Sequence, residues 1–138
     1  MYFPVRGKSI EQIEFLSSID NTLDTINGNG NPIIMGGDFN MIYNVDLDYF
    51  GSNKKEVQSR FLKHFDNYKD KWLLLDIWRG KHGLKKQYTF RQNNPFVQSR
   101  LDYFFISHSL EQIVLKCNII PSIAPDHFAV ELQFYNLP

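Results

Sequence analysis

The sequence has little cysteine, no net charge and no long apolar run. Cys117 is the one cysteine among 138 residues, which excludes an internal disulfide and a cysteine-rich zinc site and is typical of a reducing compartment. Fifteen basic side chains balance fifteen acidic ones, so any contact with a nucleic acid must be local. No apolar run approaches the roughly 20 residues of a membrane-spanning helix. We therefore expect an intracellular, soluble protein without a membrane partner.

The length and composition suit one folded domain over residues 1–138. Neither an internal repeat nor a linker-like stretch divides the chain. Aromatic residues make up 15% of the sequence, and large rings fill the space between packed sheets and helices. One α/β domain is the expectation.

The first half of the chain alternates between helical and strand patterns. Apolar residues recur every three or four positions from Ile10 to Ile26, which predicts a helix, and Ser9 and Gln12 have the spacing of a capping box. Residues 33–35 form a short apolar run that predicts a strand buried on both faces. A second helical pattern covers residues 57–68, whereas residues 73–78 fit either a strand or a turn of helix.

The second half is dominated by a period of two. Tyr88 and Phe90 share one face, and Leu101, Tyr103 and Phe105 alternate with polar neighbours. The turn composition of residues 92–95 joins these two segments into a predicted hairpin. Residues 114–120 and 128–134 are the last two predicted strands.

Polar residues gather at the ends of the predicted strands. Asp38 and Asn40 lie two residues apart after the first strand, so their side chains face the same way in extended backbone. A carboxylate there could take a proton from water while the amide orients the water or a phosphate. The alternative is a turn in which one of the two residues caps the following segment.

Three further polar groups complete the candidate set. Asp102 lies within an aromatic strand and needs a partner, which could be Arg100 on the same face or His127 from the Asp126–His127 pair. A carboxylate on His127 would favour an imidazolium, which is a suitable donor to a phosphoryl oxygen. Tyr2 lies near the end of a short strand that Pro4 terminates. Together these residues could hold a hard, oxygen-ligated cation such as Mg²⁺ beside a phosphate.

Four strings occur in a familiar order: GGDFN at 36–40, YTFRQ at 88–92, SRLDYFFIS at 99–107 and PDHFAVELQF at 125–134. They resemble the endonuclease/exonuclease/phosphatase superfamily. Within it, the sequence resembles the apurinic-type endonuclease domain of LINE-type retrotransposon polyproteins, especially through DIWR at 76–79. The resemblance implies a four-layered α/β sandwich of the DNase I-like type. It also implies that residues 1–138 are its C-terminal part, without the N-terminal strands that carry the family's metal-binding Glu and an early Asn.

The resemblance assigns roles to individual residues. The implied catalytic residues are Asp38, Asn40, Asp102, His127 and Tyr2. Asn40 and His127 would also contact the substrate, with Thr89 in a hairpin that approaches DNA, and Arg100 is a local cation that could meet a backbone phosphate. Mg²⁺, or Mn²⁺ in its place, would be held by Asp38, Asn40 and Asp126.

The implied function is Mg²⁺-dependent nicking of target DNA in the nucleus, which leaves a 3′ hydroxyl for the reverse transcriptase portion of a parent polyprotein. The chain alone is expected to be too incomplete to cut, and its exposed sheet edge to favour self-association. The alternatives are abasic-site repair, a phosphoesterase acting on lipids or small molecules, and a non-catalytic remnant that only folds or binds DNA or a partner.

Overall fold

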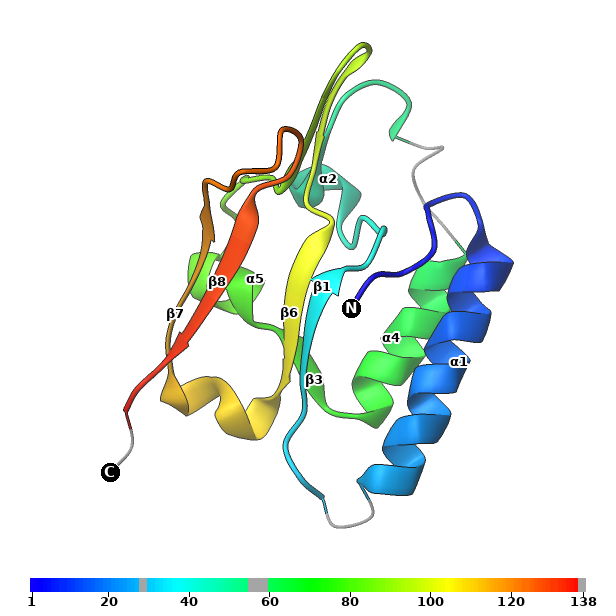
Figure 1. Ribbon diagram of the computed structural model, residues 1–138, viewed down its shortest axis with the longest axis vertical. Helices are drawn as coiled ribbons and strands as arrows, with labels where there is room; N and C mark the ends of the chain where they lie inside the picture. Colours follow the sequence, from blue (N-terminus) through cyan, green and yellow to red (C-terminus); the bar gives the residue numbers. More distant parts are fainter. Residues whose placement is uncertain (28–29, 55–59, 137–138) are drawn as a thin grey trace.

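The computed structural model describes residues 1–27, 30–54 and 60–136. Helices and strands are mixed along the chain (Figure 1). The helices are α1 (Ser9–Ile26), α2 (Val45–Asp48), α4 (Phe61–Lys71), α5 (Ile77–His82) and the 3₁₀ helix η1 (His108–Ile113). The strands are β1 (Ile34–Asp38), β2 (Tyr49–Phe50), β3 (Leu74–Asp76), β4 (Phe90–Asn93), β5 (Phe96–Ser99), β6 (Asp102–Ser107), β7 (Val114–Ile120) and β8 (Ala129–Phe134). In the described residues, no helix combines the length and the apolar character needed to cross a bilayer.

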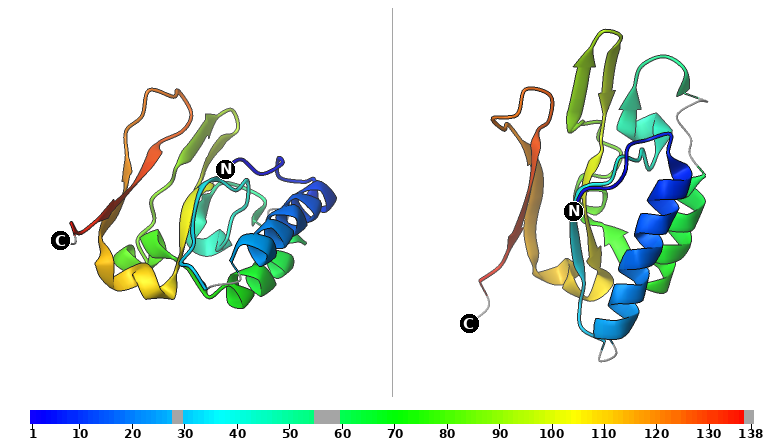
Figure 2. Two further views of the ribbon diagram at one scale, coloured as in Figure 1. Left: turned by 60° about the horizontal axis from the view of Figure 1, so that its bottom comes forward. Right: turned by 45° about the vertical axis from the view of Figure 1, so that its right-hand side comes forward.

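The described elements form layers around β6. This strand lies between β1 and β3 in an antiparallel sheet. Helices α1 and α4 cover one side of the sheet, and the β7–β8 pair lies on the other side (Figures 1 and 2). A third small sheet, β2–β5–β4, extends from one end. The arrangement confirms the predicted α/β sandwich of sheets with outer helices.

The alternation of side chains along β6 divides the core into two clusters. Tyr103 and Phe105 face the helices, where they join an aromatic cluster that includes Phe39 and Phe65. Ile106 belongs to the cluster on the opposite face, which β7 and β8 cover. Successive side chains of a strand point to opposite faces, so β6 contributes to both clusters.

Several sequence predictions are confirmed. Helix α1 and strands β7 and β8 lie within a residue or so of their expected positions. The ambiguous segment 73–78 divides into strand β3 and the start of α5, and the second predicted helix is α4, which begins at Phe61. Residues 57–59 of that prediction lie outside the described residues. The strand predicted at 33–35 is β1, but Ile34 is 49% exposed, so it is not buried on both faces.

Two predictions are wrong. The hairpin consists of β4 and β5, whereas β6 belongs to a different sheet, because the chain changes sheets between Ser99 and Asp102. A period of two shows which residues share a face but not which strands pair. The capping box is also absent: Lys8 is the N-cap of α1, its side chain makes no capping bond, and the side chain of Gln12 bonds to Pro4 and Asn40 instead.

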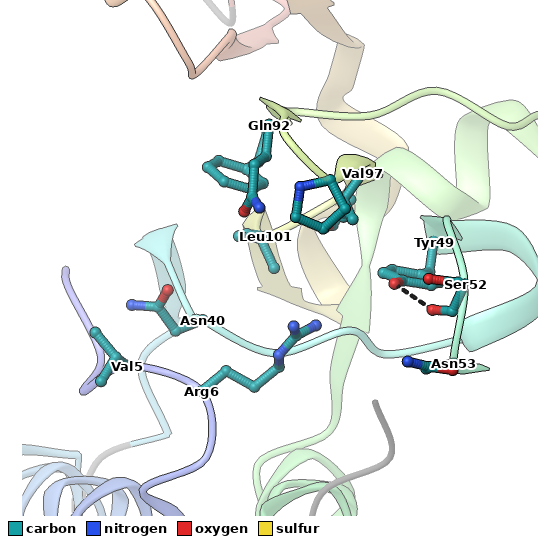
Figure 3. Close-up of a pocket in the computed structure, with 12 residues that line it drawn as sticks. Val5, Arg6, Asn40, Tyr49, Ser52, Asn53, Gln92, Val97 and Leu101 are labelled. Atoms are coloured by element: carbon teal, nitrogen blue, oxygen red, sulfur yellow. Dashed lines mark hydrogen bonds between the residues drawn. The ribbon is translucent and has the colours of Figure 1, made fainter. Parts of the chain in front are cut away.

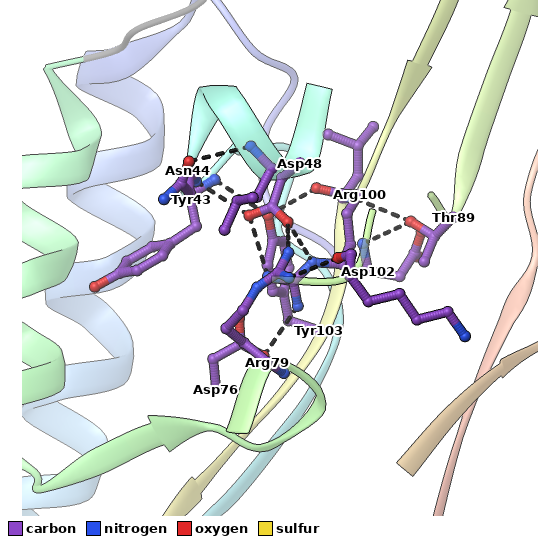
Figure 4. Close-up of polar contacts among 12 residues, drawn as sticks. Tyr43, Asn44, Asp48, Asp76, Arg79, Thr89, Arg100, Asp102 and Tyr103 are labelled. Atoms are coloured by element: carbon purple, nitrogen blue, oxygen red, sulfur yellow. Dashed lines mark hydrogen bonds and ion pairs between the residues drawn. The ribbon is translucent and has the colours of Figure 1, made fainter. Parts of the chain in front are cut away.

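A buried ion network fixes the segment where the chain changes sheets (Figure 4). The guanidinium of Arg100 is 1% exposed; its Nε lies 2.8 Å from Asp48 Oδ1 and its Nη2 2.6 Å from Asp76 Oδ2. Arg79 forms a second ion pair with Asp48, and Asp76 accepts a hydrogen bond from the backbone N–H of Arg79 at the start of α5. The network therefore ties α2, β3 and α5 to the residue that precedes the site-bearing strand β6.

Replacement of Arg100 should destabilise the protein strongly. Arg100→Gln leaves Asp76 without its cation and Asp48 with Arg79 alone, and breaking a buried ion pair costs about 3–5 kcal/mol. Arg91→Gln is the matched control, because Arg91 is exposed on β4 and should contribute less than about 1 kcal/mol. Denaturant unfolding measures both. Equal, small decreases in the free energy of unfolding of the two variants would contradict the structural role of Arg100.

Candidate active site

The register of two neighbouring strands brings the first two acidic residues together. Strands β1 and β6 are antiparallel, and Asp38 lies directly opposite Asp102. Residues opposite each other in an antiparallel pair project from the same face of the sheet. Asp102 follows the alternation of β6 toward the side of β8, so both carboxylates lie at the end of the sheet nearest the start of β8.

The glycines before Asp38 permit this close packing. A Cβ on Gly36 would lie 2.3 Å from the Phe104 ring, and one on Gly37 would lie 1.9 Å from the backbone oxygen of Met1. Gly37 also has a φ of +148°, which side chains rarely adopt. The first residues run beside β1, with Phe3 N–H donating to Asp38 O at 2.8 Å. The glycine pair therefore lets both neighbours approach the strand that carries Asp38.

His127 reaches the carboxylates from the turn before β8. Its backbone bridges Phe90, and the Phe128 N–H donates to Thr89 O at 2.7 Å. The Phe90 ring lies 5.3 Å from the His127 ring. The imidazole Nδ1 lies 2.9 Å from Asp102 Oδ2, and Nε2 lies 4.0 Å from Asp38 Oδ2. The expectation that Asp102 lies within hydrogen-bond reach of His127 is confirmed.

The hydrogen bond to Asp102 determines which tautomer the neutral imidazole adopts. An ionised carboxylate only accepts, so Nδ1 of His127 carries a proton and donates it. The second ring nitrogen, Nε2, then faces Asp38. When the ring is protonated, Nε2–H becomes a donor that a negatively charged oxygen can use.

Asp38 has the chemical environment of a general base. Burial raises the pKa of its carboxyl above the ordinary 3.8, and the negative charge of Asp102 adds to the increase. The hydrogen bond from the Asn40 N–H, at 2.8 Å, and the nearby His127 lower the pKa and offset part of the increase. A raised pKa makes the carboxylate a better proton acceptor than an exposed aspartate.

Asn40 and Tyr2 border this cluster. The side-chain amide of Asn40 donates to Phe3 O at 2.8 Å, and the Asn40 backbone N–H reaches Asp38. Tyr2 is 63% exposed and its backbone bridges Asp38. The fold thus brings four of the predicted residues together and places Tyr2 beside them.

The cluster has ligands suited to a divalent cation. Asp38, Asp102 and His127 each offer an atom, and these atoms all lie within 4.8 Å of one another. Carboxylate oxygens are the donors that Mg²⁺ and Mn²⁺ prefer. Asp126 lies outside this group: its side chain is exposed and its backbone oxygen accepts from Arg91 N–H at 2.9 Å. Its role as a metal ligand stays a prediction.

Two predicted substrate contacts need correction. Arg100 does not face solvent, because its guanidinium is buried on Asp48 and Asp76. Thr89 is fully buried, and its hydroxyl accepts from the N–H groups of Leu101, at 2.9 Å, and Asp102, at 3.1 Å. Both side chains hold the start of β6 in place and are buried rather than facing solvent. Their burial depends on tertiary partners that neither motif reveals.

A pocket of about 510 Å³ opens beside Asn40 (Figure 3). Leu101, Phe90 and Tyr49 give it apolar walls, and Arg6 lines it. No described residue pairs with the Arg6 guanidinium. Arg6 belongs to none of the motifs, so sequence reasoning missed this cation.

The comparisons with known proteins assign the chain to a family. Residues 2–124 match the model of the Endonuclease/Exonuclease/phosphatase family. Because the match covers most of the chain, this protein belongs to that family. No curated protein matches it.

Solved structures share its fold. A 3′ phosphatase from Neisseria, solved bound to a product DNA hairpin, has a TM-score of 0.73 and 17% identity, over 94% of this chain and 55% of its own. An AP endonuclease from Archaeoglobus fulgidus has a TM-score of 0.72 and 15% identity, over 96% of this chain and 57% of its own. An AP endonuclease from Leishmania major has a TM-score of 0.66 and 21% identity, over 96% of this chain and 44% of its own. The chain thus spans about half the length of these structures.

Removal of the Asp102 charge should lower the pKa of Asp38. In Asp102→Asn the electrostatic repulsion that favours protonated Asp38 disappears, whereas burial continues to act in the direction that raises the pKa. His127 lowers the Asp38 pKa, and its effect is smaller than that of Asp102. Carboxyl-detected NMR titration measures the shift, with Asp66→Asn on α4 as the control. An upward shift of the Asp38 pKa would contradict the arrangement.

Proposed function

We propose that this chain carries the catalytic residues of a Mg²⁺-dependent DNA endonuclease. The supporting observation is the group formed by Asp38, Asp102 and His127, with Asn40 at its border. The group combines a proton acceptor, an oriented imidazole and oxygen ligands in one place. Hydrolysis of a phosphodiester needs these three functions.

Each residue has a part in the proposed reaction. Asp38 accepts a proton from the water that attacks the phosphorus, while Asn40 helps to orient that water. The P–O3′ bond breaks as the new bond forms, and the leaving oxygen takes a proton from solvent to give the 3′ hydroxyl. His127, oriented by Asp102, donates a hydrogen bond from Nε2 to a phosphoryl oxygen as negative charge develops there. A bound Mg²⁺, held by Asp38 and Asn40 with Asp102 or Asp126, would offset charge on the phosphate.

The proposed biological setting is target-DNA nicking by a LINE-type retrotransposon, with the reverse transcriptase portion of the polyprotein as partner and the nucleus as the site of action. The support is the set of strings GGDFN, DIWR, YTFRQ and SRLDYFFIS, which resemble that subgroup. Abasic-site repair is the second candidate, since two of the similar structures are AP endonucleases.

The chain's length favours a further candidate for the polypeptide as given. Because it spans about half of the similar structures, the activity is proposed for a longer parent domain, and this chain alone would fold and bind DNA without cutting it. Among the strands that the structure describes, β8 pairs only with β7, so one edge of β8 is unpaired.

A plasmid-nicking assay tests the enzymatic proposal. In the longer parent, Mg²⁺ should convert supercoiled DNA to the nicked form, and a chelator should stop the reaction. Asp38→Asn and His127→Ala should each slow nicking about 10²- to 10³-fold. His64→Ala, an exposed histidine on α4, is the control and should leave the rate unchanged. Metal-independent nicking, or full activity of His127→Ala, would refute the mechanism.

Oligonucleotide substrates separate the two proposed activities. A duplex with one abasic site should be cut no faster than an intact duplex if target nicking is the function. Strong preference for the abasic duplex would instead support repair. If a folded parent cuts neither substrate, both proposed activities fail and the non-catalytic function is supported.

The unpaired edge of β8 predicts self-association of the isolated chain, because an exposed strand edge offers unused backbone hydrogen-bonding groups. Sedimentation velocity over a range of concentrations should show a species heavier than the monomer. A monomer at every concentration would contradict this prediction.

A further inference from the structure

Gln12 is a buried polar residue outside the motifs that define the site. It lies in the first turns of α1 and is 1% exposed. Its side-chain nitrogen lies 3.1 Å from Pro4 O and 3.1 Å from Asn40 O. A primary amide nitrogen has two N–H donors, and both are directed at backbone oxygens. Gln12 therefore connects the segment that carries Tyr2 to the segment that carries Asn40.

The other end of the Gln12 amide has no partner. Its Oε1 is buried, and no described residue donates a hydrogen bond to it. An unpaired buried acceptor destabilises the folded state, so the residue is poorly suited to a purely structural place in the core. An apolar side chain would remove this cost but would leave Pro4 O and Asn40 O without the donor. The Gln12 amide therefore makes both donor contacts, although its unpaired oxygen lowers the stability of the folded protein.

Asn40 is the residue that these contacts constrain most. Its φ of +46° places it in the left-handed region, which non-glycine residues seldom occupy. Its N–H donates to Asp38 Oδ1 at 2.8 Å, its C=O accepts from Gln12, and its side-chain nitrogen donates to Phe3 O at 2.8 Å. Only the side-chain oxygen is left without a partner in the described part of the chain.

These contacts also determine which way the Asn40 amide points. The backbone oxygen of Phe3 can only accept, so the amide nitrogen must face it and the amide oxygen must point away. In Figure 3 the Asn40 side chain borders the pocket that Arg6 also lines. The side-chain group left without a partner is therefore an acceptor, which suits a hard cation or the O–H of a water molecule.

We propose that Gln12 is a positioning residue, which holds Asn40 so that its side-chain oxygen is presented to a divalent cation or the attacking water. The inference rests on the proposed function for the identity of the ligand. The orientation of the Asn40 side chain does not depend on the proposed function. Gln12 acts through Asn40 and does not itself touch substrate.

The first experiment needs no activity. Gln12→Met keeps the length of the side chain and removes both donors, whereas Leu16→Met, one turn further along α1 and also buried, is the matched control. In Gln12→Met the side-chain amide signals of Asn40 in a ¹⁵N–¹H NMR spectrum should move, and the Asn40 backbone N–H should exchange with solvent about 10-fold faster. Leu16→Met should change neither. Unaltered Asn40 signals in a folded Gln12→Met would overturn the proposal.

The second experiment is a double-mutant cycle with Mn²⁺ as the probe. Gln12→Met should weaken Mn²⁺ binding about 10-fold when Asn40 is present, and should have no further effect in an Asn40→Ala background. Equal losses in both backgrounds would show a merely structural role and overturn the proposal. If the longer parent, unaltered, binds no Mn²⁺, the proposed function fails, and the NMR experiment still decides the role of Gln12.

Discussion

The pairing of Asp38 with Asp102 across two adjacent strands is the constraint on which the site depends. It places two carboxylates side by side in a partly buried position, where their repulsion is weakly screened. The protein meets this repulsion with the hydrogen bond from His127 to Asp102 and the N–H of Asn40 on Asp38. A divalent cation would relieve it further. The negative charge of Asp102 therefore raises the pKa of Asp38, and relief of the same repulsion would favour a bound cation.

Arg100 of the buried ion network and Asp102 of the candidate active site are two positions apart in the sequence. Arg100 lies in a closed ion network with Asp48 and Asp76, and Asp102 begins the strand that reaches the site. Thr89 holds the backbone between them through two hydrogen bonds. A buried network at one end of this short segment fixes the direction of the carboxylate at the other end, which is how a rigid scaffold supports preorganised chemistry.

Sequence reasoning identified the residues that the site brings together. Asp38, Asn40, Asp102 and His127 stand at strand ends in recognisable strings, so both their chemistry and their convergence could be predicted. The partition of residues 88–107 into two sheets could not, because a period of two does not say which strands pair. The burial of Arg100 and Thr89 depends on Asp48 and on residues far along the chain. Ser9 and Gln12 have the spacing of a capping box, and only the fold shows that the Gln12 amide donates to Asn40 O.

The most direct test of the site is paramagnetic NMR with Mn²⁺ on the isolated chain, which requires no turnover. Substoichiometric Mn²⁺ should broaden the signals of Asp38, Asn40, Asp102 and His127 first, because these residues surround one cation position. Asp20 and Asp24, an acidic pair on α1 that bonds Lys71, should broaden later. Broadening that begins at Asp20 and Asp24 and leaves His127 sharp would contradict the account of a single metal-dependent phosphodiesterase site.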